Sequence, residues 1–315
     1  MRFFWIKLGG GFFLILFIMV FFASKPPQDF PSGQTVHIPK NISLSEISNL
    51  IWSKHVIASP FLFESIIFAL YGQRNVVAGD YLFSKPANVW AIASRMARGE
   101  QGLPRIKITI PEGSTVRDIA WILLKNIPGF DAPYFTKVAE KSEGYLFPDT
   151  YFFYQNSTPD EILDSLKKEF KNKIKGFSSS ISLSGRKMED IVTMASIIEK
   201  EAVNSIDRAI IAGILWKRLD TGMPLQVDPP LAYITSNTTG YISIKDTQID
   251  SPYNTYKYKG LPKGPISNPG LDSLKAVLNP TPTKYFYYLS DKDGIMHYAI
   301  DHKGHVANRG KYLNK

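Results

Sequence analysis

The chain has 315 residues and a formal charge of +9, and 44% of its residues are hydrophobic. This length is enough for two domains in addition to a targeting segment. The chain contains no cysteine, which excludes disulfide frameworks and thiolate metal sites. Its positive charge suits an anionic partner, such as nucleic acid, lipid headgroups or an acidic polymer.

The N-terminal segment, residues 1–24, predicts a membrane anchor. Residues 9–23 are uncharged and mostly apolar, and with the residues before them they reach the length of a membrane span. Arg2 and Lys7 precede this apolar core, which favours an N-terminus inside the cell. A cleaved signal peptide is the alternative, although the segment lacks a clean small-residue cleavage site. In both cases the rest of the chain is exported, and residues 25–35 form a Pro-rich linker.

A pattern then occurs twice, at residues 36–47 and at residues 108–119. Each copy has a short strand, a proline, and a Ser or Thr followed three residues later by an acid. This order predicts a capping box that opens an amphipathic helix. Each copy continues into a second helix, at residues 60–71 and 133–140, and a returning strand, at residues 81–83 and 151–153. The sequence therefore predicts two βααβ units, with one more helix over residues 86–99.

The remaining elements are predicted from caps and periodicity. Thr158 and Glu161 form a capping box that opens the next helix, and residues 178–186 read as a loop. Helices are expected over residues 187–203 and 206–220. A loop-rich stretch spans residues 223–270, and a β-hairpin joins residues 285–289 to residues 295–299.

Near its C-terminal end, the helix over residues 187–203 carries two acids two residues apart, Glu199 and Glu201, beside an apolar stripe. At roughly 100° per residue, the two acids leave the helix on different sides and cannot act as a facing pair. Each lies about 80° from the middle of the stripe, on opposite borders. The pattern alone does not say which acid enters a cleft, and two solvated flank residues are the simplest interpretation.

Other sequence blocks accompany this helix. They are residues 143–151 (EGYLFPDTY), 225–229 (LQVDP), 251–256 (SPYNTY), 260–262 (GLP) and 265–270 (PISNPG). In this order they resemble the endolytic murein transglycosylase (YceG-like) family, over roughly residues 140–310. The resemblance implies an α+β fold with an N-terminal transmembrane helix, a LysM-like βααβ subdomain at residues 36–103 and a mixed α+β catalytic domain at residues 104–315. LysM modules grip glycan chains; a simple spacer or a surface for partner proteins are the alternatives for residues 36–103.

The resemblance also implies the activity. Enzymes of this family cleave the bond after N-acetylmuramic acid in nascent peptidoglycan and leave 1,6-anhydro ends. The second Glu of the family's E-K-E triplet is the catalytic acid, which corresponds to Glu201. One carboxylic acid suffices, because the C6 hydroxyl of the sugar is the nucleophile and the same residue acts as acid and then as base. Glu199 is expected to be structural, in a salt bridge or at the helix flank, and the orientation of groups near Glu201 is the alternative.

Substrate-binding residues are expected in the other blocks. Glu143 contributes to the cleft or fixes a turn. Asp228 precedes two prolines and either binds sugar or caps the next helix. Aromatic, amide and hydroxyl groups are what sugar recognition needs. The full predicted set is Glu143, Gln226, Asp228, Tyr253, Asn254, Thr255 and Tyr256.

Metal, cofactor and nucleic-acid binding are not expected. His297, His302 and His305 lack metal-ligand spacing. His305 resembles the histidine of the family's closing E-H-N-like element, but this chain has Gly304-His305-Val306 there, so the match is incomplete. The basic residues are scattered through an exported chain. The expected partners are glycan strands, the cytoplasmic membrane and, through the resemblance, peptidoglycan synthases. The rival hypotheses are a non-catalytic glycan-binding scaffold for cell-wall synthesis and a secreted solute-binding protein.

Overall fold

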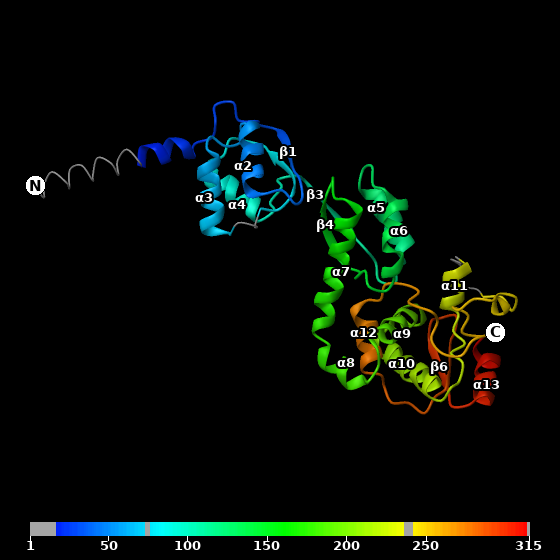
Figure 1. Cartoon of the computed structure of the whole chain (residues 1–315). Coiled ribbons are helices and arrows are strands. Elements are labelled where there is room, and N and C mark those ends of the chain that lie inside the picture. Colours follow the sequence, from blue (N-terminus) through cyan, green and yellow to red (C-terminus); the bar gives the residue numbers. More distant parts are fainter. Residues whose placement is uncertain (1–16, 73–75, 236–241, 314–315) are drawn as a thin grey trace, which may run out of the picture. The chain divides into compact units, whose positions relative to one another are not determined.

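The computed structural model describes residues 17–72, 76–235 and 242–313, and its elements form a mixed α+β chain (Figure 1). The α+β class predicted from the sequence is therefore confirmed. The chain forms two compact units. Unit 1 comprises Met1–Arg105 and Tyr154–Asn156, and unit 2 comprises Ile106–Phe153 and Ser157–Lys315.

The predicted membrane anchor lies largely outside the described residues. Of residues 1–24, only 17–24 are described, and these are helical with exposed apolar side chains such as Phe17 and Phe22. No helix in the described part of the chain is long and apolar enough to cross a membrane. The anchor therefore stays a prediction.

Over its described residues from 34 to 97, unit 1 combines a two-stranded antiparallel sheet with three helices. Its elements are β1 (Gln34–Ile38), α2 (Leu44–Ser53), α3 (Pro60–Leu70), β2 (Gly79–Phe83) and α4 (Val89–Ala97). In the sheet, Val36 lies opposite Tyr81. The predicted capping box opens α2, because Ser43 and Glu46 each accept a hydrogen bond from the backbone N–H of the other. All five elements contribute side chains to one core, which includes the fully buried Phe63.

The second copy of the strand–helix–helix–strand repeat follows in the chain. It consists of β3 (Arg105–Thr109), α5 (Val116–Asn126), α6 (Ala132–Ala139), the 3₁₀ turn η1 (Glu140–Ser142) and β4 (Thr150–Tyr154). β3 pairs with β4. Thr115 and Asp118 form the predicted capping box of α5. The βααβ order predicted for both copies of the repeat is therefore confirmed.

The next two helices are α7 (Pro159–Lys175) and α8 (Ser178–Ser184). α7 begins at the predicted capping box of Thr158 and Glu161. The loop predicted over residues 178–186 is wrong, because α8 occupies most of it. The serine-rich sequence has no helical stripe. The short helix depends instead on Ile181 packing against the core of unit 2, and on Gly185, whose φ of 64° ends the helix.

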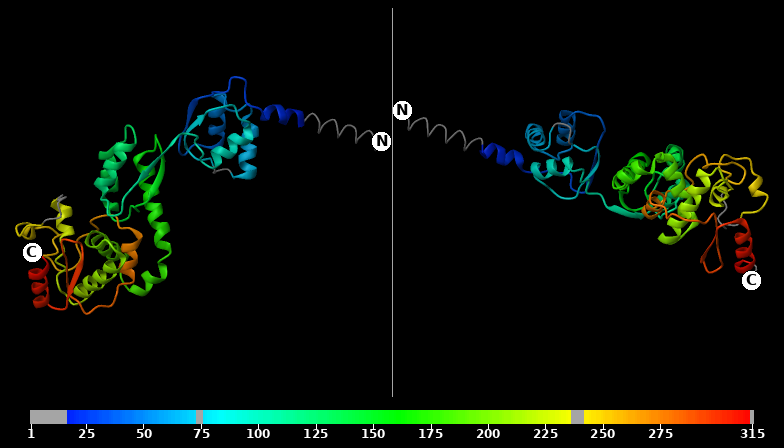
Figure 2. Two further views of the ribbon diagram at one scale, coloured as in Figure 1. Left: turned by 180° about the vertical axis from the view of Figure 1, so that it is seen from behind. Right: turned by 90° about the horizontal axis from the view of Figure 1, so that it is seen from below.

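The core of unit 2 is built on α9 (Met188–Glu201), α10 (Ser205–Asp220) and α12 (Leu271–Leu278), which lie side by side (Figures 1 and 2). α9 is more buried than its single predicted apolar face implies, since all residues 191–198 are buried. The Ser196 hydroxyl is satisfied inside this core, donating to the Thr193 carbonyl at 2.7 Å and accepting from the Ile266 N–H at 3.0 Å. α9 is therefore a central helix with a firmly held C-terminal end.

The C-terminal third mixes confirmed and corrected elements. The loop-rich stretch contains α11 (Pro229–Thr235) and the 3₁₀ turn η2 (Asp246–Gln248). The predicted hairpin is confirmed as β5 (Tyr287–Ser290) and β6 (Met296–Ala299). α12 and α13 (His302–Tyr312) are not predicted. α12 is short, and α13 has no buried residue, so neither leaves a long apolar stripe in the sequence.

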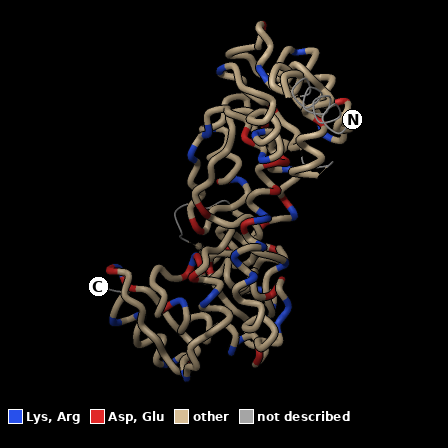
Figure 3. The backbone as a smooth tube through the Cα atoms, turned by 90° about the vertical axis from the view of Figure 1, so that its left-hand side faces the viewer, with Lys and Arg blue, Asp and Glu red and all other residues tan. Residues whose placement is uncertain are grey.

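Charged residues of both signs are interspersed along the described chain (Figure 3). Most of the ion pairs between described residues are partly exposed and contribute little to stability. Glu199–Arg208 is different, because its two side chains are only 5% and 9% exposed. Glu199 of this buried pair lies two residues before Glu201 on α9.

Candidate active site

Glu201 is the last residue of α9 and is partly buried. The helix ends there because Ala202 has extended backbone, with φ −143° and ψ 148°. The carboxyl group therefore stands at the helix C-terminus, where the helix dipole disfavours a negative charge. The end of α9 thus places a potential proton donor at the last residue of a buried helix, two residues before the end predicted from the sequence.

One hydrogen bond holds the Glu201 carboxyl group. The Tyr288 hydroxyl on β5 donates to Oε2 at 2.9 Å, and no other described residue bonds this group. Burial raises the pKa of Glu201 to about 7, and the nearby charge of Asp228 acts in the same direction. The Tyr288 bond and Arg218 oppose the shift. A carboxylic acid with a pKa near neutrality and a free oxygen is suited to both giving and taking a proton.

Two further charged groups border this acid. Arg218 on α10 is 5% exposed, and its Nε donates to the Phe286 carbonyl at 2.7 Å. Asp228 is exposed and accepts a hydrogen bond from the Tyr256 hydroxyl at 2.5 Å. Arg218 and Asp228 act on the Glu201 carboxyl group with opposite electrostatic sign. We call Glu201, Tyr288, Arg218, Asp228 and Tyr256 the acid site.

Gln226, in the loop beside the acid site, has an unusual backbone conformation. Its φ is 49°, in the left-handed region that residues other than Gly rarely adopt, and its side chain is exposed. Its backbone N–H donates to the Thr255 carbonyl at 3.1 Å. Backbone strain of this kind is concentrated at functional sites, which is consistent with the predicted role of Gln226.

Asn254 and Thr255 differ from the exposed members of the predicted set, because each is only 1% exposed. The Asn254 amide donates to the carbonyls of Thr247 and Ile249, at 2.9 and 2.8 Å. The Thr255 hydroxyl donates to the Val227 carbonyl at 3.1 Å. Groups bonded in this way are not available to a ligand. Their position assigns both residues to holding the loop in shape, and not to direct contact with a sugar.

Glu143 occupies a different, enclosed position. It is 8% exposed and accepts hydrogen bonds from the Val116 N–H, the Asn268 amide and the Tyr233 hydroxyl. Burial raises its pKa to about 7, although the hydrogen bonds from Val116 and Tyr233 oppose this shift. The carboxyl group thus joins the start of α5 to α11 and to the loop that contains Asn268.

The predicted tyrosines connect the two carboxyl positions. Tyr253 packs its ring against Tyr233, with the centroids 5.4 Å apart, and Tyr233 bonds Glu143. Tyr256, three residues after Tyr253, bonds Asp228 at the acid site. α11 follows Asp228 directly, and the Asp228 carbonyl accepts from the N–H groups of its residues 231 and 232. The Asp228 carboxylate bonds the Tyr256 hydroxyl and no backbone N–H of α11, so the structure shows no side-chain cap by Asp228.

Both oxygens of the Glu199 carboxyl group accept hydrogen bonds from the protein. Its carboxyl group accepts from Arg208 Nη2 at 2.7 Å and from the Gly270 N–H at 2.8 Å. Arg208 also bonds Asp272 at 3.0 Å and the Ala202 carbonyl at 3.0 Å. The structural salt bridge expected for Glu199 is confirmed. Of Glu199 and Glu201, only Glu201 keeps an unbonded oxygen.

The histidines have separate surroundings. His297 bonds Asp291 at 2.8 Å and stacks on Tyr312. His305 stacks on Tyr287, and its buried Nδ1 has no hydrogen-bond partner among the described residues. Over residues 17–72, 76–235 and 242–313, no group of three or more His, Asp or Glu side chains could hold a metal ion.

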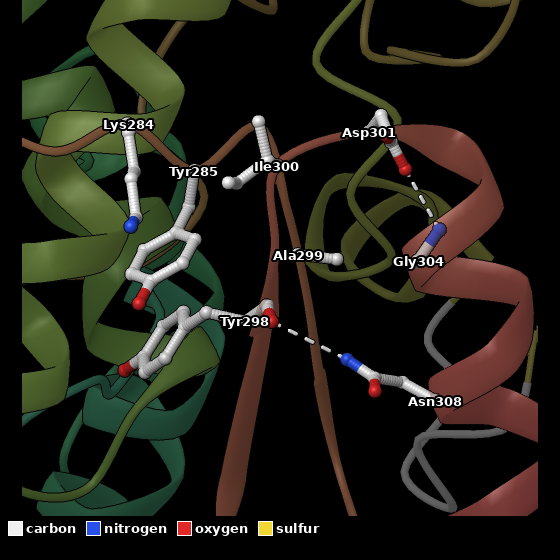
Figure 4. A pocket seen from close by; sticks show the side chains of 8 residues that line it. All are labelled: Lys284, Tyr285, Tyr298, Ala299, Ile300, Asp301, Gly304 and Asn308. Carbon is white, nitrogen blue, oxygen red and sulfur yellow. Dashed lines mark hydrogen bonds between the residues drawn. The ribbon is translucent and has the colours of Figure 1, made fainter.

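A cavity of about 340 Å³ lies at the open end of the hairpin, away from its turn (Figure 4). Its lining includes Tyr285 and Tyr298, whose rings stack with centroids 5.3 Å apart, and Asn308, which donates to the Tyr298 carbonyl at 3.3 Å. Tyr298 is the register partner of Tyr288. Directly paired residues share one face of a sheet, so this aromatic pair lies on the face of the hairpin that carries Tyr288.

Sequence reasoning missed several residues of these sites. Tyr288 lies within the predicted hairpin, where an aromatic residue is an ordinary strand former. Arg218 carries no signal beyond its place in the last turn of a helix. Asn268 was part of a recognised block, and its burial at 0% exposure marks it as central. The contacts of all three depend on chain segments distant in sequence.

The fold and the acid site together define a class of protein: an α+β protein with a carboxyl group of raised pKa at the end of a buried helix, beside a tyrosine-rich loop. Residues 36–311 match the YceG-like family, and the chain belongs to that family. The resemblance drawn from the sequence blocks is therefore confirmed.

Known relatives agree with this assignment. A protein of Bacillus subtilis (strain 168), named endolytic murein transglycosylase, is 30% identical over 91% of this chain and 87% of its own length. A protein of the same name from Streptococcus pneumoniae serotype 2 (strain D39 / NCTC 7466) is 26% identical over 97% of this chain, which spans 63% of that relative. The crystal structure of a YceG-like protein from Listeria monocytogenes has a TM-score of 0.59 and 30% identity, covering 87% of this chain and 98% of that one.

Proposed function

We propose that the chain is a lytic transglycosylase, a carbon–oxygen lyase that acts on peptidoglycan and cleaves inside glycan strands. Membership of the YceG-like family and the name of the Bacillus subtilis relative support the enzyme class. The bond cleaved lies between N-acetylmuramic acid and N-acetylglucosamine, and the product carries a 1,6-anhydro end. The single observation that carries the proposal is the Glu201 carboxyl group, which has one hydrogen bond and a pKa raised to about 7.

Glu201 acts twice in this mechanism. As an acid it protonates the glycosidic oxygen, and the bond between that oxygen and C1 of the muramoyl sugar breaks. As a carboxylate it then takes the proton of the C6 hydroxyl while the C6 oxygen bonds to C1. Protons and electrons balance without water. The Tyr288 hydroxyl holds Oε2 throughout, which leaves Oε1 to exchange the proton.

The reaction differs from ordinary glycoside hydrolysis, which uses two carboxylates. Asp228 is the acid whose charge acts most on Glu201, and it is exposed and bonded by Tyr256. Its role is electrostatic: its negative charge favours the protonated form of Glu201. Arg218 has the opposite effect, because its positive charge stabilises the Glu201 carboxylate after the proton has left.

The remaining predicted residues either line the substrate groove in this proposal or hold its loop in place. Gln226, Tyr253 and Tyr256 offer amide, aromatic and hydroxyl groups to the sugars. Asn254 and Thr255 hold the loop that carries the two tyrosines. Glu143 supports the same loop through Tyr233, which makes it a positioning residue.

The proposal extends to unit 1 and to the cell. Residues 36–103 form the LysM-like subdomain that grips glycan, residues 25–35 are the linker and residues 104–315 are the catalytic domain. Residues 1–24 anchor the chain in the cytoplasmic membrane by a single pass with the N-terminus inside. The catalytic domain is then extracytoplasmic, close to nascent strands and to peptidoglycan synthases.

The test uses the full chain in detergent with un-crosslinked glycan strands, and mass spectrometry of the products. Glu201→Gln should lower the rate by roughly 10²–10⁴, the usual contribution of a general acid or base. Glu189→Gln is the matched control, because Glu189 is an exposed acid at the start of the same helix. Circular dichroism and the melting temperature establish that each variant folds.

The other outcomes are distinct. Full activity in Glu201→Gln, with loss in a folded Glu199→Gln, would move the acid to Glu199. Products ending in reducing sugars would make the enzyme a hydrolase. Binding of glycan without any cleavage by the unaltered chain would favour the scaffold hypothesis.

A further inference from the structure

α3 is an exposed helix with almost no charge. Its sequence, PFLFESIIFAL, contains one ionisable residue, Glu64, and this carboxyl group accepts a hydrogen bond from the buried Ser48. Phe63, Ile66 and Ile67 face the core of unit 1. A helix that is apolar on all sides is normally covered on all sides. The exposure of the outward side of α3 therefore requires an explanation.

That outward side is aromatic. Phe61 is 80% exposed and Phe68 is 64% exposed. Residues seven apart lie on one face of a helix, and Ser65 stands between them on the same face. We call Phe61, Ser65 and Phe68 the α3 face. Trp52, on the last turns of α2, is 52% exposed and adds a further aromatic group near the α2–α3 connection.

The chain enters unit 1 beside this helix. Asp29 Oδ2 lies 2.8 Å from His55 Nδ1, in the connection between α2 and α3. Phe30 is 8% exposed and packs edge-on against Phe83 in the core. Within unit 1, the chain therefore packs against the core from Asp29 onward, near the α2–α3 connection.

Only residues 25–28 separate this attachment from the apolar N-terminal segment, whose described part ends at residue 24. Four residues span at most about 14 Å. α3, with 11 residues, is about 16 Å long. If the N-terminal segment lies in a bilayer, a tether this short keeps α3 at the level of the lipid headgroups. Lys25 and Lys54 are exposed at the same end and suit anionic headgroups.

We propose that the α3 face is a membrane-docking surface that lies in the interfacial layer of the bilayer, with Phe61 and Phe68 among the lipids. The proposal rests on the membrane anchor of the proposed function. Exposed aromatic side chains are favoured at this depth. Docking would hold unit 1 against the membrane and restrict the distance at which unit 2 meets its glycan substrate.

The absence of cysteine makes a direct test possible. Single variants Phe61→Cys and Phe68→Cys of the full chain are labelled with a nitroxide and reconstituted into vesicles of phosphatidylglycerol and phosphatidylethanolamine. Trp121→Cys is the matched control, because Trp121 is an aromatic residue of a unit 2 helix and is 61% exposed. The ratio of collisions with oxygen to collisions with a water-soluble nickel complex should be several-fold higher at positions 61 and 68 than at position 121.

Each other outcome overturns the proposal in its own way. If the chain does not rise with the vesicles in a density gradient, the predicted membrane anchor is wrong and docking fails with it. Cleavage by Glu201 in detergent is unaffected by this result. If the chain floats but positions 61 and 68 stay as accessible to nickel as position 121, docking alone is wrong. If added glycan strands, and not lipid, shield the two labels, the α3 face is a glycan surface.

Discussion

Unit 2 contains two carboxyl regions that respond alike to burial but are built differently. In the acid site, Glu201 has one hydrogen bond, from Tyr288. In a second region, which we call the polar seam and which comprises Ser114, Glu143, Glu199, Arg208 and Asn268, every carboxyl group is bonded on several sides. Burial raises the pKa of Glu143 and of Glu201 to about 7 in both.

The difference shows that a raised pKa by itself does not identify a catalytic acid. Glu143 is satisfied by three donors, and moving its proton would disturb a bonded network. Glu201 can exchange a proton through Oε1 without breaking a bond to the protein. Changes in the polar seam should therefore reduce stability, and changes in the acid site should alter the rate and its pH dependence.

The largest effect on stability is expected from Asn268→Ala. The Asn268 side chain is fully buried, donates to Glu143 and the Ser114 carbonyl at 2.9 Å, and accepts from the Leu146 N–H at 2.8 Å. Its loss leaves buried groups unsatisfied, which should lower the free energy of unfolding by roughly 4 kcal/mol. Urea denaturation measures this. An unchanged midpoint would mean that the seam is not a stabilising network.

Glu143→Gln should change how stability depends on pH. In the unaltered chain, the folded form of Glu143 binds its proton more tightly than the unfolded form, because its pKa is about 7 instead of 4.5. Its contribution is therefore complete below pH 4.5 and is lost as the pH rises through 7, by about 3 kcal/mol. Glu143→Gln should remove this slope, as followed by melting temperature against pH.

Glu201→Gln provides the comparison, since it removes only the slope that Glu201 contributes in the same pH range. A Glu143→Gln variant that loses activity as completely as Glu201→Gln, while staying folded, would break the distinction between the two regions.

Tyr288→Phe should lower kcat/KM by about tenfold, equivalent to about 1.4 kcal/mol for a positioning hydrogen bond. Loss of the donor also removes an interaction that lowers the pKa of Glu201. The pKa should rise, and the alkaline limb of the pH–rate profile should move to higher pH. Tyr287→Phe is the matched control on the adjacent position of β5. A profile that does not move would exclude Tyr288 as a positioning residue.

Asp228→Asn is expected to have the smallest effect and the opposite sign. The charge of Asp228 raises the pKa of Glu201, so its removal should move the alkaline limb to lower pH by less than about one pH unit. The Asn oxygen can still accept the Tyr256 hydrogen bond, which preserves the loop. A limb that moves upward, or a large loss of kcat at low pH, would mean that Asp228 exchanges protons itself.

Features that depend on neighbouring residues were predictable from the sequence. The capping boxes at Ser43, Thr115 and Thr158 open helices as expected, because a side chain and a backbone N–H three residues apart meet without help from the rest of the fold. The βααβ repeat, the central helix with Glu201 and the C-terminal hairpin follow from the same local periodicity.

Features that depend on packing were not. α8, α12 and α13 are short or exposed, and they form because the core of unit 2 or a cap beside it supports them. The helical pattern alone also could not separate Glu199 from Glu201, since their helical angles are equivalent relative to the apolar stripe; the family resemblance was needed to choose between them.

The sequence by itself determined the order of the elements, the family and the short set of acids from which a catalyst could come. Only the tertiary structure shows how the surroundings of those acids differ, because it brings Tyr288 to Glu201 across 87 residues and Gly270 to Glu199 across 71. Such contacts form between segments that share no local pattern, and burial and bonding assign a carboxyl group its role only after these segments have met.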